Sequence, residues 1–352
     1  MKSKTTIFCL VYFLAATLFA QEDPVRREIQ KLIRYETNIR YENTPGFIIA
    51  MVEKDTTFIF SFGRRAEHDT APINENDLFE IGGVTKLYTA LLVNHLVGQG
   101  KLDLNQSVAS FMDISNPALE SCTLLSLLTH TCGLPKYPSN WGELEKEANN
   151  PFANFTNHEL EAFLSAYDKP VKANPDYLYS HLNFVVLQWI LYKVTGLEYE
   201  EFLRQVLQPL HLNASTRSST TVTGYGFDIK IKPPWTAQAY TGSIGIKTSL
   251  NDLIRFCQYT LNNKPEFKPL LQRVPIHIGK NEGWVSLGWQ VLPVLKNRYV
   301  YAHTGRTEGH HSFVGLLPET GTAVIILSNS AHGTDPLGLS ILNMMNKNWK
   351  RK

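Results

Sequence analysis

The sequence predicts an α+β protein in which both ends of the chain build one antiparallel sheet and a helical domain is inserted between them. Three observations support this fold class. Strand-like segments lie near the N-terminus and again in the last third, residues 101–235 have mainly helical patterns, and an amphipathic helix is expected at each end. The 352 residues, 43% of them hydrophobic and 19% charged, are enough for a large core and one or two domains.

The N-terminus is typical of a secretory signal peptide. Lys2 and Lys4 precede the apolar stretch "TIFCLVYFLAATLFA", which is too short for a stable membrane anchor, and cleavage is expected after Ala20. Phe8 precedes Cys9 where a lipidation site would carry a small residue, so no lipid anchor is expected. The mature protein is therefore expected to be secreted or periplasmic. The net charge of +2 for the full chain gives no reason to expect a nucleic-acid partner.

The first elements after the signal peptide follow in order. Asp23 and Pro24 mark the start of an amphipathic helix that is expected to run to about Tyr41. The segments "GFIIAMV" and "TFIFSF" flank "EKDT" and predict a hairpin with largely buried strands. Residues 86–97 are apolar on nearly all helical faces, which predicts a buried helix that ends at Gly98 to Gly100.

The middle of the chain shows helical patterns. Thr156 and Glu159 have the spacing of a capping box at the start of "TNHELEAFL", and Gly196 ends the buried run "NFVVLQWILYKVTG". Two further predicted helices are "CTLLSLLTHTCGLP" and "EYEEFLRQVLQPL".

The last third returns to strands. The segments "NRYVYAHTG", "HHSFVGLLPETG" and "TAVIILSNS" predict three strands, with "PETG" as a tight turn between the last two. A closing helix is expected from about Asp335, with Pro336 in its first turn.

Three cysteines remain after signal cleavage: Cys122, Cys132 and Cys257. Their spacing matches no zinc pattern, and an odd count leaves at least one free thiol. Buried, unpaired cysteines are the simplest interpretation, and a bridge between Cys122 and Cys132 stays open.

Lys86 is the residue that most needs an explanation. It is the one full charge after Glu80 in a mostly apolar run. Burying an ammonium costs several kcal/mol unless the group is paired or its pKa falls. The ordinary alternatives are an ammonium that reaches solvent or one that pairs with a carboxylate.

Two other segments carry residues that could act with Lys86. Tyr179 lies in "YSHLN", just before a buried helix, and His303, Thr304 and Gly305 lie on a predicted strand. Each segment alone is weak support for a site. No metal site is expected, because the neighbouring His310 and His311 should point to opposite faces of their strand. No cofactor is expected.

Taken together and in order, "GVTK" (83–86), "YSH" (179–181) and "HTG" (303–305) resemble motifs of the penicillin-recognising serine hydrolases, most closely the class C β-lactamases. That family carries Ser-x-x-Lys at the start of a central helix, a Tyr-x-Asn loop, and Lys-Thr-Gly or His-Thr-Gly on a facing strand. Further segments, such as "GKLDLNQSVASF", "LLSLLTHTCGLP" and "VSLGWQVLP", also resemble class C segments in the expected order. The resemblance covers essentially the whole mature chain.

The resemblance implies a three-layer α/β/α sandwich with an antiparallel sheet and an inserted all-α domain. Residues 21–85 and 236–352 would form the sheet domain and residues 86–235 the mainly helical domain, with the active-site cleft between them. The ligand of such a cleft would be a small molecule or peptide that resembles a peptidoglycan stem or a β-lactam.

The sequence departs from the family pattern at its most important position. Gly83 stands where the family has its nucleophilic serine, and glycine has no oxygen for attack on a carbonyl. Lys86 and Tyr179 occupy the positions that would help remove the serine proton, and the backbone N–H groups of Gly83 and Arg306 could still hold an oxyanion. Loss of such a nucleophile typically costs about 10⁶ in turnover.

The substrate-binding positions are also altered. His181 replaces the asparagine that would bond the substrate amide, and Asn183 could substitute in part if the loop shifts. His303, Thr304, Gly305 and Arg306 would form the substrate-binding strand. Neighbouring hydroxyls do not replace the serine: Thr85 lies roughly 200° round the helix from Gly83, and Ser180 should point away from Tyr179.

Four hypotheses follow. The first is an exported pseudoenzyme that binds a D-Ala-D-Ala-like peptide or another small acyl compound without acyl-enzyme turnover. The second is a hydrolase in which Tyr179, its pKa lowered by Lys86, acts as base on a water. The third is a structural or partner-binding protein with a packed cleft. In the fourth, Gly83 is a substitution in an otherwise active hydrolase.

Overall fold

The computed structural model describes residues 23–36, 45–144, 150–169, 176–217, 221–278, 281–295 and 298–347. Helix α1 spans Pro24–Glu36. The expected continuation of this helix to about Tyr41 lies outside the described residues, as does the predicted signal peptide. Among the described helices, none has both the length and the apolar character needed to cross a bilayer.

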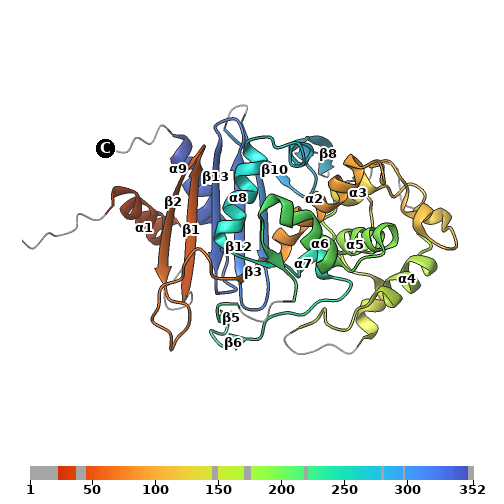
Figure 1. Cartoon of the computed structure of the whole chain (residues 1–352), viewed down its shortest axis with the longest axis horizontal. Coiled ribbons are helices and arrows are strands. Elements are labelled where there is room, and N and C mark those ends of the chain that lie inside the picture. The colour runs from red at the N-terminus through yellow and green to blue at the C-terminus, as the bar shows by residue number, and fades with distance from the viewer. Residues whose placement is uncertain are drawn as a thin grey trace, which may run out of the picture.

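One antiparallel sheet of eight strands is the centre of the structure (Figure 1). Its strands run in the order β2-β1-β13-β12-β11-β10-β9-β8, so the N-terminal hairpin pairs with the last strand of the chain. This arrangement confirms the predicted sheet built from both chain ends. The strands are β1 (Gly46–Glu53), β2 (Thr56–Gly63), β8 (Val274–Ile278), β9 (Asn281–Val285), β10 (Gln290–Leu295), β11 (Arg298–Arg306), β12 (His311–Leu317) and β13 (Thr322–Ser328).

Helices cover both faces of the sheet, which gives the expected three layers. Alternate residues of β1 point to opposite faces. Phe47 and Ile49 pack with α1 and with α9 (Asp335–Asn346), whereas Ile48 and Ala50 belong to the core shared with α8 (Leu250–Leu261). The expected α+β class with an antiparallel sheet is therefore confirmed.

The helical part of the molecule lies beside the sheet in Figure 1. It consists of α2 (Thr85–Gly98), α3 (Leu124–Leu128), α4 (Asn157–Ala166), α5 (His181–Thr195), α6 (Tyr199–Leu207) and the short α7 (Thr241–Ile244). Helix α2 is buried on nearly every face, as predicted, and the capping box of Thr156 and Glu159 is present at α4. The domain limits at residues 85/86 and 235/236 stay a prediction.

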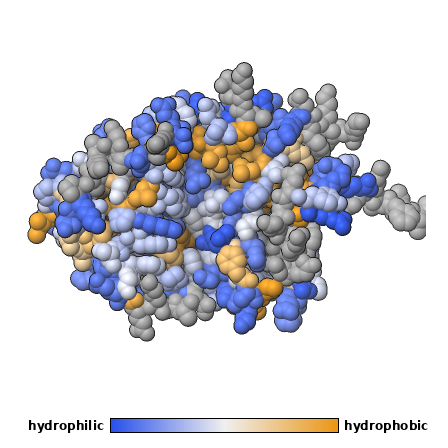
Figure 2. Space-filling model, turned by 180° about the vertical axis from the view of Figure 1, so that it is seen from behind, coloured by the Kyte–Doolittle hydropathy of each residue, from blue (hydrophilic) through white to orange (hydrophobic). Residues whose placement is uncertain are grey.

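Short strands connect the two parts. They are β3 (Phe79–Glu80), β4 (Ala214–Ser215) and β7 (Lys247–Thr248) in one small sheet, and β5 (Gly224–Tyr225) and β6 (Ile231–Lys232) in another. Strand β3 leads directly into the turn before α2, so this sheet helps to fix the start of that helix. Figure 2 shows the opposite side of the molecule, where hydrophilic side chains dominate and apolar ones form scattered patches.

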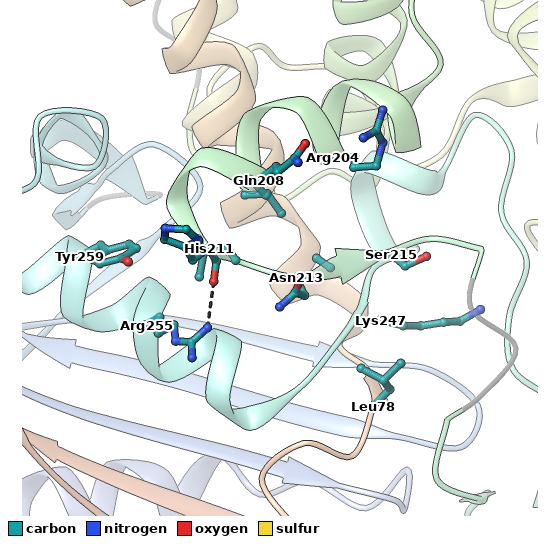
Figure 3. A pocket seen from close by; sticks show the side chains of 12 residues that line it. Leu78, Arg204, Gln208, His211, Asn213, Ser215, Lys247, Arg255 and Tyr259 are labelled. Carbon is teal, nitrogen blue, oxygen red and sulfur yellow. Dashed lines mark hydrogen bonds between the residues drawn. The ribbon is translucent and has the colours of Figure 1, made fainter.

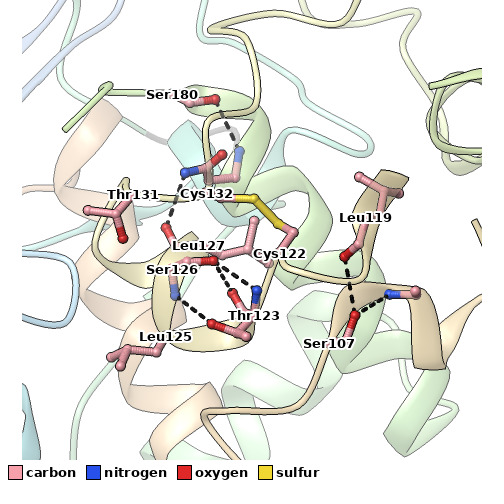
Figure 4. Close-up of a disulfide and its surroundings, with 12 residues drawn as sticks. Ser107, Leu119, Cys122, Thr123, Leu125, Ser126, Leu127, Thr131, Cys132 and Ser180 are labelled. Carbon is pink, nitrogen blue, oxygen red and sulfur yellow. Dashed lines mark hydrogen bonds between the residues drawn. A yellow bond between two sulfur atoms is a disulfide. The ribbon is translucent and has the colours of Figure 1, made fainter. Parts of the chain in front are cut away.

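Two cysteines are bridged, so the interpretation of all three as unpaired was wrong. Cys122 and Cys132 form a disulfide with a Cα–Cα distance of 5.1 Å (Figure 4). Helix α3 folds the chain back between them, and reciprocal bonds between Thr123 and Ser126 close its first turn. Cys257 is buried and free.

Candidate active site

The three motif segments of the sequence meet at Gly83. Residues Gly82–Val84 form a 3-10 turn before α2, in which Gly82 has a positive φ of 47° that favours glycine. A Cβ on Gly83 would lie 2.6 Å from the Thr304 carbonyl oxygen, 3.2 Å from Cε1 of His303 and 3.4 Å from the Tyr179 hydroxyl. The structure thus brings GVTK, YSH and HTG together, but strand β11 occupies the space that a side chain at position 83 would need.

Lys86 is buried with 0% exposure and does not reach solvent. Its Nζ donates to the Ser243 carbonyl oxygen at 2.9 Å and lies 3.3 Å from Nδ1 of His181. The ammonium also lies over the rings of Tyr179 and Phe184, 5.3 and 5.5 Å from their centroids. Among the described residues no carboxylate pairs with it, and burial lowers the pKa of Lys86 to about 7.

Tyr179 is close to Lys86, as expected, but the pKa of its hydroxyl is not shifted in the expected direction. Burial raises the pKa of its hydroxyl well above the usual range. Lys86 lies over the ring face of Tyr179. The idea that Lys86 lowers the pKa of Tyr179 and makes it a base is therefore wrong, because desolvation dominates. Lys86 itself is the group whose pKa is near neutrality.

Three histidines surround this lysine and tyrosine. His130, His181 and His303 all have a lowered pKa, chiefly through burial and next through the charge of Lys86; that of His303 falls to about 3. They are therefore neutral near pH 7. The sequence interpretation missed His130, although it lies inside "LLSLLTHTCGLP", one of the segments on which the resemblance depended.

Two ring nitrogens of these histidines are buried without a partner among the described residues. Nδ1–H of His303 donates to the Thr304 carbonyl oxygen at 2.8 Å, so its Nε2 is an unpaired acceptor. Nδ1 of His130 accepts from the Ser180 N–H at 3.2 Å, so its Nε2–H is an unpaired donor. A buried polar group without a partner costs about 1–3 kcal/mol, so each of these two ring nitrogens needs a hydrogen-bond partner that the described residues do not supply.

His181, which the resemblance places at the asparagine position, lies close to Lys86, and Asn183 does not. The amide of Asn183 is buried in α5 and donates to the Leu127 carbonyl oxygen at 3.3 Å, so the expected partial substitution was wrong. Nδ1 of His181 lies 3.3 Å from the hydroxyl of Ser243. Ser243 was not recognised from the sequence, because only the fold carries α7 to this position.

The other hydroxyls near Gly83 point away, as expected. Thr85 accepts from the Ile246 N–H at 3.1 Å, and Ser180 donates to the Pro135 carbonyl oxygen at 2.7 Å. Both hydroxyls are therefore engaged in hydrogen bonds away from Gly83.

The backbone of strand β11 packs closely against the backbone of the turn before α2. A Cβ on Gly305 would overlap the Ile81 carbonyl oxygen, and a Cβ on Gly82 would lie 2.6 Å from the backbone nitrogen of Arg306. The Arg306 side chain is exposed, and its guanidinium carbon lies 5.2 Å from the ring centroid of Phe227. Thr304 is partly exposed, so this edge of the site meets solvent.

His310 and His311 point to opposite sides, as expected for neighbours on a strand. Nδ1 of His310 lies 3.1 Å from the Glu80 carboxylate, whereas Nδ1 of His311 lies 3.0 Å from the Thr334 hydroxyl. Burial acts to raise the pKa of Glu80, but the bonds from His310 and Thr307 outweigh it and the pKa is lowered. Within the described ranges, no three or more His, Cys, Asp or Glu residues are grouped so as to hold a metal.

A family model for beta-lactamases matches residues 32–342. The chain belongs to the beta-lactamase family. Among relatives, it is 25% identical to a beta-lactamase of Pseudomonas fluorescens (84% of this chain, 91% of the relative) and 22% identical to a beta-lactamase of Escherichia coli K12 (93% and 94%). It is also 22% identical to Protein flp of Staphylococcus aureus N315 (93% and 67%).

Solved structures of this family share the fold. A beta-lactamase/D-alanine carboxypeptidase from Pseudomonas syringae superposes with a TM-score of 0.78 at 18% identity, covering 92% of this chain and 98% of that one. A class C beta lactamase from Rhodobacter sphaeroides gives 0.73 at 18% identity, covering 91% and 97%. The identities are low, so these structures support the fold alone.

A cavity of about 1040 Å³ lies away from Gly83, beside α6 and α8 (Figure 3). Its basic side chains are already engaged: Arg255 donates to the His211 carbonyl oxygen, Arg204 pairs with Glu201, and Lys247 donates to the Trp235 carbonyl oxygen. They do not converge on a common point in Figure 3. This cavity therefore gives no argument for a ligand.

Proposed function

We propose that this member of the beta-lactamase family is an exported pseudoenzyme that binds a small acyl compound or peptide beside Lys86 and Tyr179 without forming an acyl-enzyme. The ligand class is a D-Ala-terminated peptide or a β-lactam-like molecule. One observation carries the proposal: a Cβ at Gly83 would lie 2.6 Å from the Thr304 carbonyl oxygen. The position lacks both the nucleophilic oxygen and the space for its side chain.

Other observations support binding rather than a merely packed cleft. Nε2 of His303 and Nε2 of His130 are buried without partners among the described residues, and a polar ligand could satisfy them. Tyr179, His181 and Thr304 are partly exposed, so a ligand could approach from this side. Relatives of this chain from Pseudomonas fluorescens and Escherichia coli are described as beta-lactamases, which supports the ligand class.

The test combines mass and binding measurements on the exported protein. We expect no mass gain after incubation with a fluorescent penicillin, and saturable calorimetric binding of benzylpenicillin or of N-acetyl-D-Ala-D-Ala. Lys86→Met should weaken that binding, whereas Lys101→Met, an exposed lysine beyond the end of α2, should leave it unchanged. A covalent adduct, or no binding of either compound, would overturn the proposal. N-terminal sequencing of the exported protein tests cleavage after Ala20.

A second candidate function is that of a slow hydrolase. The pKa of Lys86 favours a hydrolase in which Lys86 is the general base over one in which Tyr179 is the base. A lysine whose pKa is about 7 is partly neutral at physiological pH and can accept a proton from water. Turnover of a chromogenic ester that is lost in Lys86→Met and kept in Tyr179→Phe would support this candidate. Protein recovered only with a macromolecular partner, and without small-molecule binding, would instead support a structural role.

A further inference from the structure

A second cavity, of about 760 Å³, lies between the first turns of helices α4 and α6 and the chain segment 234–241. Its volume is in the range of pockets that hold small-molecule ligands. No residue of the three sequence motifs lines it. Polar side chains dominate its lining, among them Asn157, Glu198, Arg217, Thr236 and Thr241.

Buried aromatic rings separate this cavity from the candidate site. The centroid of the Phe152 ring lies 6.4 Å from that of His181, a residue of the site. The same Phe152 ring lies 5.1 Å from the ring of Trp235 and 4.8 Å from the ring of Tyr240. All three aromatic side chains are buried, and the chain neighbours of Trp235 and Tyr240 line the cavity. A ligand in the cavity would therefore be held apart from the candidate site.

Hydrogen bonds within the protein hold the wall of the cavity in place. The Gln188 side chain accepts from the Gly242 N–H at 2.5 Å and donates to the Gln238 carbonyl oxygen at 2.9 Å. The Asn150 amide donates to the carbonyl oxygen and to the hydroxyl of Thr236, at 2.8 and 2.9 Å. The wall is thus formed before a ligand arrives, which lowers the entropic cost of binding.

This wall presents both hydrogen-bond donors and acceptors. Oδ1 of Asn157 is buried and has no partner among the described residues. The Thr236 hydroxyl accepts from Asn150, so its own proton stays available for donation. The Thr241 hydroxyl donates to the Ala237 carbonyl oxygen, so its lone pairs can still accept. Helix α6 has no side-chain cap at its start, so the N–H groups of its first turn lack an intrahelical partner.

The charges of the lining balance. The carboxylates of Glu198 and Glu200 stand against the cations of Arg217 and Lys247. Glu200 is also engaged by the N–H and the hydroxyl of Thr216, both at 2.6 Å. A charged ligand would meet repulsion as well as attraction here, so the lining favours a neutral one. Because a hydroxyl group both donates and accepts, a neutral compound with several hydroxyl groups matches this wall.

We propose that this cavity binds a neutral saccharide. Its hydroxyl groups donate to Oδ1 of Asn157 and to the Thr241 hydroxyl, and they accept from the Thr236 hydroxyl. This inference goes beyond the proposed function, because the saccharide site is separate from the one beside Lys86 and Tyr179 and neither proposal depends on the other.

Calorimetric titration of the purified protein with maltose and with N,N′-diacetylchitobiose tests the inference. We expect saturable binding of at least one of these neutral disaccharides. Asn157→Leu should weaken that binding at least about tenfold, because a sugar hydroxyl then loses its acceptor. Asn157→Asp is the matched control, since it keeps an oxygen at this position, and its affinity should stay within about threefold of the wild type.

A second pair of variants tests the location. His158→Trp places a large ring at an exposed position that lines the cavity and should abolish saccharide binding. Ser165 is exposed on the same helix outside the lining, so Ser165→Trp should bind as the wild type does.

Several outcomes would overturn the inference. They are no binding of either disaccharide, binding that survives both His158→Trp and Asn157→Leu, and an equal loss of affinity in Asn157→Asp and Asn157→Leu. Tighter binding of maltobionate, the anion obtained by oxidising maltose, than of the neutral disaccharides would also overturn it. The proposed function is tested separately, because its ligands are benzylpenicillin and N-acetyl-D-Ala-D-Ala and its variant is Lys86→Met.

Discussion

Nζ of Lys86 lies 3.3 Å from Nδ1 of His181, and no carboxylate among the described residues pairs with that lysine. In the motif that this sequence resembles, an asparagine amide would stand at the position of His181. Burial lowers the pKa of the Lys86 amine and of the His181 imidazole. Near neutral pH the imidazole is therefore uncharged, and the amine is only partly protonated. The Lys86 amine thus faces a neutral imidazole, and Gly83, three residues before it, offers no side-chain oxygen.

The first prediction concerns covalent chemistry. The purified protein should gain no mass on incubation with a fluorescent penicillin, because Gly83 has no side-chain oxygen and Thr85 and Ser180 are engaged elsewhere. A class C β-lactamase treated in parallel provides the positive control. An adduct that peptide mapping places within residues 79–90 would contradict both the pseudoenzyme proposal and this geometry.

The second prediction concerns stability and pH. Unfolded lysine has a pKa of about 10.4, and Lys86 has about 7 when folded, so the unfolded chain binds more protons between these values. The contribution of Lys86 to the free energy of unfolding should therefore be most unfavourable below pH 7 and should improve as the pH rises towards 10. Between these two pKa values, the contribution of Lys86 to the free energy of unfolding changes by at most roughly 5 kcal/mol.

Lys86→Met isolates this effect in urea unfolding. The variant should be more stable than the wild type at pH 6, and the difference should shrink by pH 9.5. Lys101→Met removes an exposed lysine instead and should show no such trend. A wild-type minus Lys86→Met difference that stays constant from pH 6 to 9.5 would show that Lys86 is not desolvated.

The third prediction concerns Gly83→Ser. The new Cβ must displace the Thr304 backbone, so we expect a loss of about 1–3 kcal/mol in the free energy of unfolding. Slow acylation by a penicillin or a chromogenic ester should nevertheless appear, because Lys86 lies one helical turn away and can take the serine proton. Adding His181→Asn should raise the acylation rate further, and the two effects should not be independent.

Gly83→Ala is the matched control for this variant, since it adds the same Cβ without an oxygen. It should show the same loss of stability and no acylation. If a folded Gly83→Ser stays as inert as Gly83→Ala, the cleft has lost its chemistry and the structural hypothesis gains over ligand binding.

The fourth prediction concerns the disulfide. The mature chain, unfolded without reductant, should show one titratable thiol, from Cys257, and three after reduction. Replacing Cys122 and Cys132 by serine should lower the free energy of unfolding by about 2–3 kcal/mol, the value expected for a loop of this length. Three thiols before reduction would rule out the bridge between Cys122 and Cys132.

Local patterns in the sequence were sufficient for the α+β class with a sheet built from both chain ends, whereas the segments of the site were predicted from the resemblance to class C β-lactamases. Alternation and helical spacing predicted the strands of β1, β2 and β11 to β13 and the buried α2, because side-chain periodicity follows directly from backbone geometry. The resemblance of GVTK, YSH and HTG to family motifs predicted that they belong to one site, and the structure brings them together at Gly83.

What the sequence could not determine depends on distances between segments far apart in the chain. The partner of Lys86 is supplied by α5 and α7, 95 and 157 residues away, so neither His181 nor Ser243 follows from local spacing. The raised pKa of Tyr179 comes from desolvation, which is a property of the packed site and reversed the expectation. The approach of Thr304 to Gly83 likewise exists only once β11 packs on the turn before α2, because a glycine lets two backbones come closer than any side chain allows.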